Sequence, residues 1–213
     1  MSEKAQSMRS KIAKKIQDET PEEVRVFARQ YTDMHNSMDK SCSSKNDYMD
    51  PSLNVLLWQQ FGAAIDMLEN AISACPNELW NTGSQFWYKA FHTLYWLDYY
   101  LSDTPKESDF FPPAPFTKSE FEDDVMPERV YDKAELLTYL RFCRRKCHDL
   151  LAGSTAEELL VNRFVSEYKD FSILELLLYN MRHVQHHTGQ LNLLLRQGMN
   201  VPPRWVSRTK ESL

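Results

Sequence analysis

Apolar side chains recur every three or four positions from Leu53 to Ile72, a spacing that places them on one face of an α-helix. The pattern predicts a core helix that begins near residue 51 and ends near Cys75. The 213 residues include only 5 glycines, and alternating runs rich in Val, Ile and Thr are few, which argues against a sheet protein. The chain is therefore expected to be all-helical.

Three further segments carry the helical pattern. Residues 84–101 are apolar on nearly all sides, which is typical of a helix buried on several faces. Residues 132–152 and 172–197 each carry one apolar stripe, and Gly198 supplies a stop for the last of them. Four core helices in a chain of this length predict an all-α four-helix bundle.

Two parts of the chain fall outside this pattern. Residues 1–49 are polar and charged with a helix-favouring composition, so we expect them to form an N-terminal helical extension to a bundle of residues 50–213. Residues 102–130 contain five of the ten prolines and predict a long loop. The FFPPAPF run within this loop could be a lid over a site or a strap that closes the bundle.

Composition excludes several classes of function. A formal net charge of -5 and the absence of a basic stripe argue against nucleic-acid binding. No stretch approaches the ~18 apolar residues that span a bilayer, and the charged N-terminus does not resemble a secretory signal. The four cysteines are too sparse and irregular for a disulfide framework. We therefore expect a cytoplasmic protein.

Three histidines form a candidate metal site. His183 and His187 are four residues apart on the fourth helix, so their side chains share one stripe at a separation that lets two imidazoles converge. His92 lies midway along the second helix among apolar neighbours, where an imidazole is costly unless it is hydrogen-bonded or metal-bound. Three neutral imidazoles suit zinc, nickel, copper or iron and leave a coordination position open. The alternative is that they are ordinary core or surface histidines.

Neighbours of the histidine pair indicate its chemistry. In zincin proteases a glutamate follows the first histidine as general base, but here Val184 takes that place, so the protease reading fails. Gln190 and Asn180 lie one turn to either side of the pair on the same stripe. Each could hydrogen-bond a ligand imidazole or bound water, or simply be bonded to a neighbouring helix. His186 is expected either on the flank of the helix or in support of the ligands, and not as a ligand itself.

Aromatic and cysteine residues of the core helices have two readings as well. Tyr95 and Tyr99 lie nearest the His92 face and could line a substrate cavity, although ordinary aromatic packing is the alternative. Cys143, Cys147 and His148 could form a second site on the third helix, but the two cysteines follow its apolar stripe. We interpret them as core residues because buried free cysteine behaves as a small hydrophobe.

The motif His183-Val-Gln-His186-His187-Thr-Gly-Gln190 and the aromatic second helix around His92 resemble the DinB-like (DinB/YfiT) superfamily of helical metalloenzymes. The resemblance covers about residues 50–200. It implies that His92, His183 and His187 are the ligands of one divalent transition metal ion, zinc or nickel. It also implies an up-and-down bundle with a long crossover between the second and third helices.

The resemblance implies a metal-dependent enzyme. Characterised relatives include thiol-dependent S-transferases and a thiol-dependent isomerase, in which the metal activates a low-molecular-weight thiol, so we expect a small-molecule substrate of this kind. Relatives often pair as homodimers. No carboxylate base is visible within the motif, and no catalytic residue is assigned. The competing hypotheses are a non-catalytic metal-binding or stress-response bundle and a helical interaction module without a metal.

Overall fold

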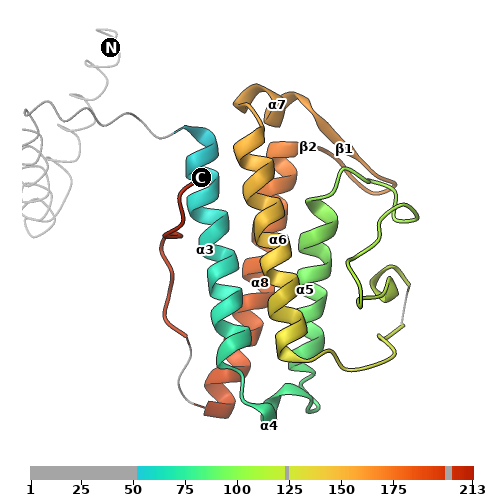
Figure 1. Ribbon diagram of the computed structural model, residues 1–213, viewed down its shortest axis with the longest axis vertical. Coiled ribbons are helices and arrows are strands. Elements are labelled where there is room, and N and C mark those ends of the chain that lie inside the picture. The colour runs from blue at the N-terminus through green and yellow to red at the C-terminus, as the bar shows by residue number, and fades with distance from the viewer. Residues whose placement is uncertain (1–51, 123–124, 200–202) are drawn as a thin grey trace, which may run out of the picture. The chain divides into compact units, whose positions relative to one another are not determined.

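Four long helices form the bundle in the computed structural model (Figure 1). They are α3 (Leu53–Ala74), α5 (Phe86–Tyr100), α6 (Lys133–Gly153) and α8 (Ile173–Met199). The structure describes residues 52–122, 125–199 and 203–213, so the predicted N-terminal helical extension, residues 1–49, lies outside the described residues. All four core helices occur where the apolar periodicity predicts them, and the all-α fold is confirmed.

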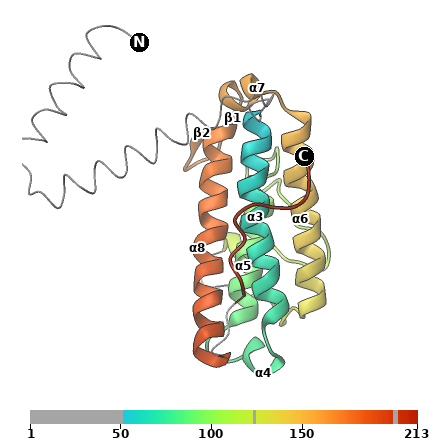
Figure 2. The same ribbon diagram turned by 90° about the vertical axis from the view of Figure 1, so that its left-hand side faces the viewer.

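The order of the helices depends on a long crossover. Helices α3 and α8 run in one direction, and α5 and α6 run in the other (Figures 1 and 2). The crossover between α5 and α6 returns the chain to the opposite end of the bundle, so the up-and-down alternation is interrupted there. The one regular element described within the crossover is the 3-10 turn η1 (Ser119–Phe121).

The start of α6 is fixed by its own sequence. The Asp132 carboxylate accepts a hydrogen bond from the Glu135 backbone N–H at 2.8 Å, and the Glu135 carboxylate accepts one from the Asp132 N–H at 2.8 Å. This reciprocal capping box satisfies two N–H groups that would otherwise lack partners. Arg129 pairs with the same Glu135 carboxylate, which ties the end of the crossover to the helix.

The core lies between the apolar stripes of the four helices. Helix α5 packs against both α8 and α6, and α3 packs against both α6 and α8, so α5 is buried on nearly all sides as predicted. Cys143 and Cys147 are fully buried, in agreement with their interpretation as core residues. None of the helices in the described part of the chain combines the length and apolarity that a membrane crossing requires.

Short elements that the periodicity does not predict cover the ends of the bundle. They are α4 (Asn77–Trp80), α7 (Ala156–Val161) and the antiparallel pair β1 (Arg163–Val165) and β2 (Asp170–Ser172). The β1–β2 hairpin packs on the end of α5, where the ring of Phe164 contacts that of Tyr99 at 5.7 Å. Strands of three residues are too short to show an alternating pattern, so periodicity gives no signal for them.

The C-terminal segment, residues 203–213, lies along α3 as a strap (Figure 2). The Trp58 indole N–H donates to the Glu211 carbonyl at 2.9 Å, and the Thr209 N–H donates to the Gln59 carbonyl at 3.1 Å. A Cβ atom at Gly62 would lie 2.7 Å from a side-chain carbon of Thr209, so a residue without a side chain is needed for this close approach.

Candidate metal centre

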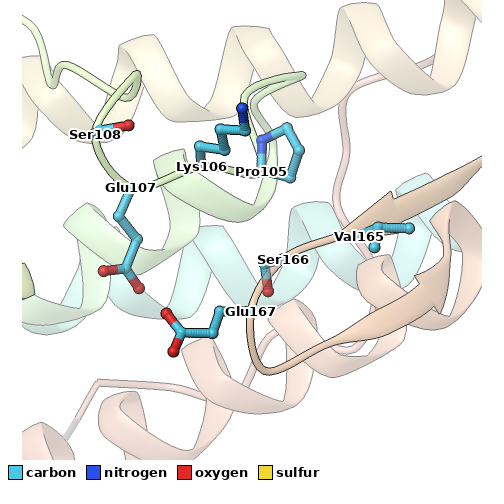
Figure 3. A pocket seen from close by; sticks show the side chains of 7 residues that line it. All are labelled: Pro105, Lys106, Glu107, Ser108, Val165, Ser166 and Glu167. Atoms are coloured by element: carbon cyan, nitrogen blue, oxygen red, sulfur yellow. The ribbon is translucent and has the colours of Figure 1, made fainter.

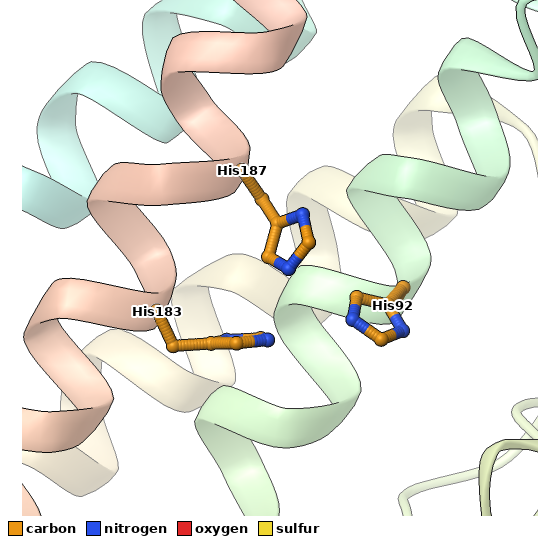
Figure 4. Close-up of side chains that lie close together, drawn as sticks. All are labelled: His92, His183 and His187. Atoms are coloured by element: carbon orange, nitrogen blue, oxygen red, sulfur yellow. The ribbon is translucent and has the colours of Figure 1, made fainter.

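His92 of α5 and His183 and His187 of α8 point toward one another across the helix interface (Figure 4). Their ring centroids are 5.3 Å apart for His92–His183, 4.7 Å for His92–His187 and 4.5 Å for His183–His187. One ligand nitrogen from each ring lies within 4.8 Å of the other two. The structure thus brings together the three histidines that the sequence singled out.

A buried hydrogen bond fixes the two helices against each other beside this centre. Asn180, one turn before His183, is fully buried, and its side-chain amide donates to the Leu97 carbonyl of α5 at 3.1 Å. Of the two sequence interpretations of Asn180, the bond to a neighbouring helix is the one observed. The bond holds the α8 backbone at the height where its histidines meet His92.

Glu120 of η1 orients His92, and sequence analysis missed it. Its carboxylate lies 2.6 Å from His92 Nδ1 and accepts a bond from the Trp96 indole N–H at 3.3 Å, with the Glu120 side chain only 3 % exposed. Because Nδ1 is engaged, the ring keeps Nε2 for another partner. Carboxylate–histidine pairs of this kind orient metal ligands. Glu120 stands in the crossover, 28 residues from His92, and no local motif marks it.

Gln190 performs the same task for His187. Its side-chain oxygen lies 2.9 Å from His187 Nδ1, and its amide nitrogen lies 3.1 Å from His186 Nε2. The predicted hydrogen bond from Gln190 to a candidate ligand imidazole is therefore observed, and His186 occupies the exposed flank, as expected. His92 and His187 both have Nδ1 engaged, and no described residue bonds the other nitrogen, Nε2, on either ring.

Burial keeps two of the imidazoles neutral. It lowers the pKa of His183 to about 3, with smaller contributions from the neighbouring His187 and His92, and it also lowers the pKa of His187. Neutral imidazole is the form that binds a metal ion. His183 Nδ1 is buried and has no hydrogen-bond partner among the described residues. An all-nitrogen donor set of this kind fits a divalent transition metal.

Comparison with protein families gives this centre a context. Residues 54–191 match the family described as the DinB superfamily. The chain belongs to the DinB superfamily. The matched region contains all three histidines and both side chains that orient them, Glu120 and Gln190. No curated protein matches the chain.

Tyr95 and Tyr99 belong to an aromatic cluster beneath the crossover of the DinB bundle. The Tyr99 hydroxyl donates to the Pro105 carbonyl at 2.7 Å, so it fastens the crossover to α5. Tyr95 is fully buried, and its ring contacts those of Phe110 and Phe121 at 5.4 and 5.2 Å. Burial raises the pKa of both phenols, that of Tyr99 to about 12. The contacts of both residues are those of aromatic packing, the alternative interpretation.

Two hollows adjoin the centre of the DinB bundle. The first has a volume of about 400 Å³ and is lined by Tyr179, Arg182, His183 and His186. The second has a volume of about 270 Å³ and is lined by Tyr88, Ser119, Glu120, Glu122, Val125 and Met126. A small molecule in the first hollow would lie against His183, and one in the second would lie against Glu120, which contacts His92.

A further cavity of about 400 Å³ lies between the start of the crossover and the β1–β2 turn (Figure 3). The side chains of Glu107 and Glu167 extend toward each other across it. None of the residues that line it belongs to the histidine centre or supports it. This cavity is therefore separate from the histidine centre.

Proposed function

We propose that this DinB-superfamily protein is a metal-dependent enzyme, a thiol-dependent S-transferase or a related enzyme. His92, His183 and His187 would hold one divalent ion, zinc or nickel. The observation that carries the proposal is the convergence of these imidazoles from two helices, two of them held neutral by burial and two oriented by hydrogen bonds at Nδ1.

The open coordination position explains how such a centre serves catalysis. Three protein ligands are typical of catalytic rather than closed structural metal centres. When bound, the metal lowers the pKa of a thiol or water and so supplies a nucleophile at neutral pH. Glu120 and Gln190 keep the rings of His92 and His187 in place. His183 faces a hollow large enough for a small molecule.

The family resemblance favours a low-molecular-weight thiol as the nucleophile. In the proposed transfer, the thiol sulfur forms a bond to an electrophilic carbon, the leaving group departs with the bonding electrons, and the thiol proton passes to water. Hollows with polar side chains in their walls, such as Arg182 in the first and Glu120 in the second, support this function over the alternative of a non-catalytic metal-binding or stress-response bundle. A non-catalytic bundle would be expected to have a dry, filled interior around the ion.

Metal analysis of the wild type beside His187→Ala tests the proposal. We expect the wild type to bind about one zinc or nickel ion per chain, and the variant to bind it at least ~100-fold more weakly because one of three ligands is lost. His148→Ala is the matched control, since His148 lies on α6 and contacts Trp58 and the strap instead. This control should retain the metal.

A conjugation assay tests the reaction itself. Glutathione, cysteine and other common cellular thiols are each offered with 1-chloro-2,4-dinitrobenzene to the metal-loaded protein. Metal-dependent turnover that His187→Ala abolishes is the expected result. Bound metal without turnover for any thiol would instead favour the non-catalytic bundle. Absence of metal, with no thermal shift on adding zinc or nickel, would leave the helical interaction module.

A further inference from the structure

The hollow on the flank of α8 shares one residue, His183, with the histidine centre. Its wall is formed by Tyr179, Arg182, His183 and His186, which follow one another at helical spacing. His183 belongs both to this wall and to the three-histidine cluster. A molecule bound in this hollow therefore lies against His183 and the other three side chains together.

Arg182 is a cation without an internal partner at this wall. It is exposed and makes no hydrogen bond or ion pair with any residue that the structure describes. By contrast, Arg129, Arg144 and Arg163 each pair with a carboxylate. Other exposed arginines, such as Arg196, also lack partners among the described residues, but Arg182 shares a hollow with a member of the centre. A guanidinium in this position offers two parallel N–H donors to a planar anion.

A second cation lies over the same wall. The Lys169 ammonium, from the segment before β2, lies 5.4 Å from the ring centroid of Tyr179 and 5.3 Å from that of Tyr100. Its charge is one of the smaller causes of the lowered pKa of His183, after burial and the neighbouring histidines. Positive charge thus gathers beside the centre in a chain whose formal net charge is -5.

The second hollow, beside Glu120, carries the opposite charge. Glu120 and Glu122 line it, and Glu120 is already committed to His92. An anionic group is disfavoured there by like charge and favoured at the α8 hollow by opposite charge. A substrate that carries one anionic group would therefore be oriented with that group toward α8.

We infer that the α8 hollow binds the carboxylate of a small substrate, with Arg182 as the residue that selects for it. The inference rests on the proposed function, because it assigns the orientation of the substrate at that centre. A planar carboxylate accepts both N–H donors of a guanidinium, whereas a neutral amide of the same size cannot match two donors with two acceptors.

Paired thiols test this inference on the zinc-loaded full-length protein. Mercaptoacetate, 3-mercaptopropionate and 4-mercaptobutyrate are each compared with the corresponding neutral amide by isothermal titration calorimetry. For at least one chain length, the acid should bind roughly tenfold more tightly than the amide, the lower end of what a charge-assisted hydrogen bond contributes. Arg182→Gln should remove this preference and leave amide binding unchanged. The matched variant Arg196→Gln should keep the preference.

Two results would overturn the inference. One is equal binding of acid and amide at every chain length in the wild type, which leaves the proposed thiol chemistry intact. The other is a preference for the acid that survives Arg182→Gln. If neither kind of thiol binds, the proposed thiol chemistry fails instead. Binding of succinate, a carboxylate without a thiol, is then measured to test the α8 hollow alone. Succinate should bind the wild type about tenfold more tightly than it binds Arg182→Gln. Equal affinities, or no binding to the wild type, would overturn the inference as well.

Discussion

Helix α5 carries a polar cluster on each of two faces, and the clusters differ in how completely their atoms are bonded. Toward α6, the Asp98 carboxylate accepts hydrogen bonds from the Lys146 ammonium at 2.6 Å and from the Tyr139 hydroxyl at 2.9 Å. The ammonium also donates to the Asp98 carbonyl at 3.0 Å. Both carboxylate oxygens of this nearly inaccessible residue have partners, so the cluster is complete.

Toward α8, the histidine centre is incomplete. His183 Nδ1 and Glu120 Oε1 are buried and have no hydrogen-bond partner within the described part of the chain. Buried polar atoms are normally bonded, and each exception calls for an explanation. A complete network stabilises the fold by itself, whereas an incomplete one in which neutral imidazoles converge is suited to a ligand. The comparison therefore separates a cluster that completes its own bonding from one that is suited to hold a ligand, and α5 contributes a residue to each.

The largest expected effect comes from a substitution that breaks the complete cluster. Asp98→Ala leaves the Lys146 ammonium and the Tyr139 hydroxyl without their shared partner, and removal of one member of a buried ion pair costs about 3 kcal/mol or more. Urea unfolding should show this loss in the free energy of unfolding, while metal content per folded chain stays the same. Asp103→Ala, at an exposed acid of the crossover, is the control. An equally stable Asp98→Ala variant would contradict the structural role.

The next effect concerns the support of the histidine centre. Glu120→Gln replaces the charged acceptor at His92 Nδ1 with a neutral one, and we expect zinc or nickel affinity to fall about 10- to 100-fold. The free energy of unfolding of the metal-free protein should not fall, because the variant removes a buried charge. Competition with a chelator measures the affinity, and Glu122→Gln is the neighbouring control. Unchanged affinity in Glu120→Gln would show that the contact does not orient a ligand.

The smallest expected effect is a pH dependence. The pKa of His183 lies at about 3 in the folded protein instead of its ordinary 6.5. Between these values the unfolded chain binds a proton that the folded protein does not, so stability falls as pH drops below 6.5. From about pH 7.5 to about pH 5.5 the metal-free protein should lose about 1 kcal/mol. His183→Gln should lose that much less over the same interval, and parallel curves for both proteins would refute the assignment.

The four helices could be predicted because their apolar periodicity is a local property. Each of them places core residues every three or four positions, and burial of that stripe fixes the helix in the structure. Helix α7 also had a usable signal, since Thr155 and Glu158 form a capping box that sequence analysis did not exploit. The strap and the β-hairpin had no local sequence signal, because they depend on contacts with distant residues such as Trp58 and Tyr99.

The residues of the candidate site also differ in whether local sequence could predict them. His183, His187 and Gln190 share one stripe of α8, so their relation follows from helix geometry alone. His92 could be added because an imidazole in an apolar helix needs a partner. Glu120 and Arg182 could not be assigned a role from sequence. Glu120 contacts His92 from an irregular segment, and the role inferred for Arg182 depends on the hollow that it lines, which only the structure reveals.

The crossover contributes the carboxylate that steadies His92, and this has a thermodynamic consequence. Two events that stabilise each other do so by the same amount in both directions. If docking of the crossover raises the affinity for a metal ion, then metal binding must make detachment of the crossover less favourable by the same factor. Proteolytic cleavage near η1 would thus slow on metal loading in the wild type, and the slowing would be smaller without the Glu120 carboxylate.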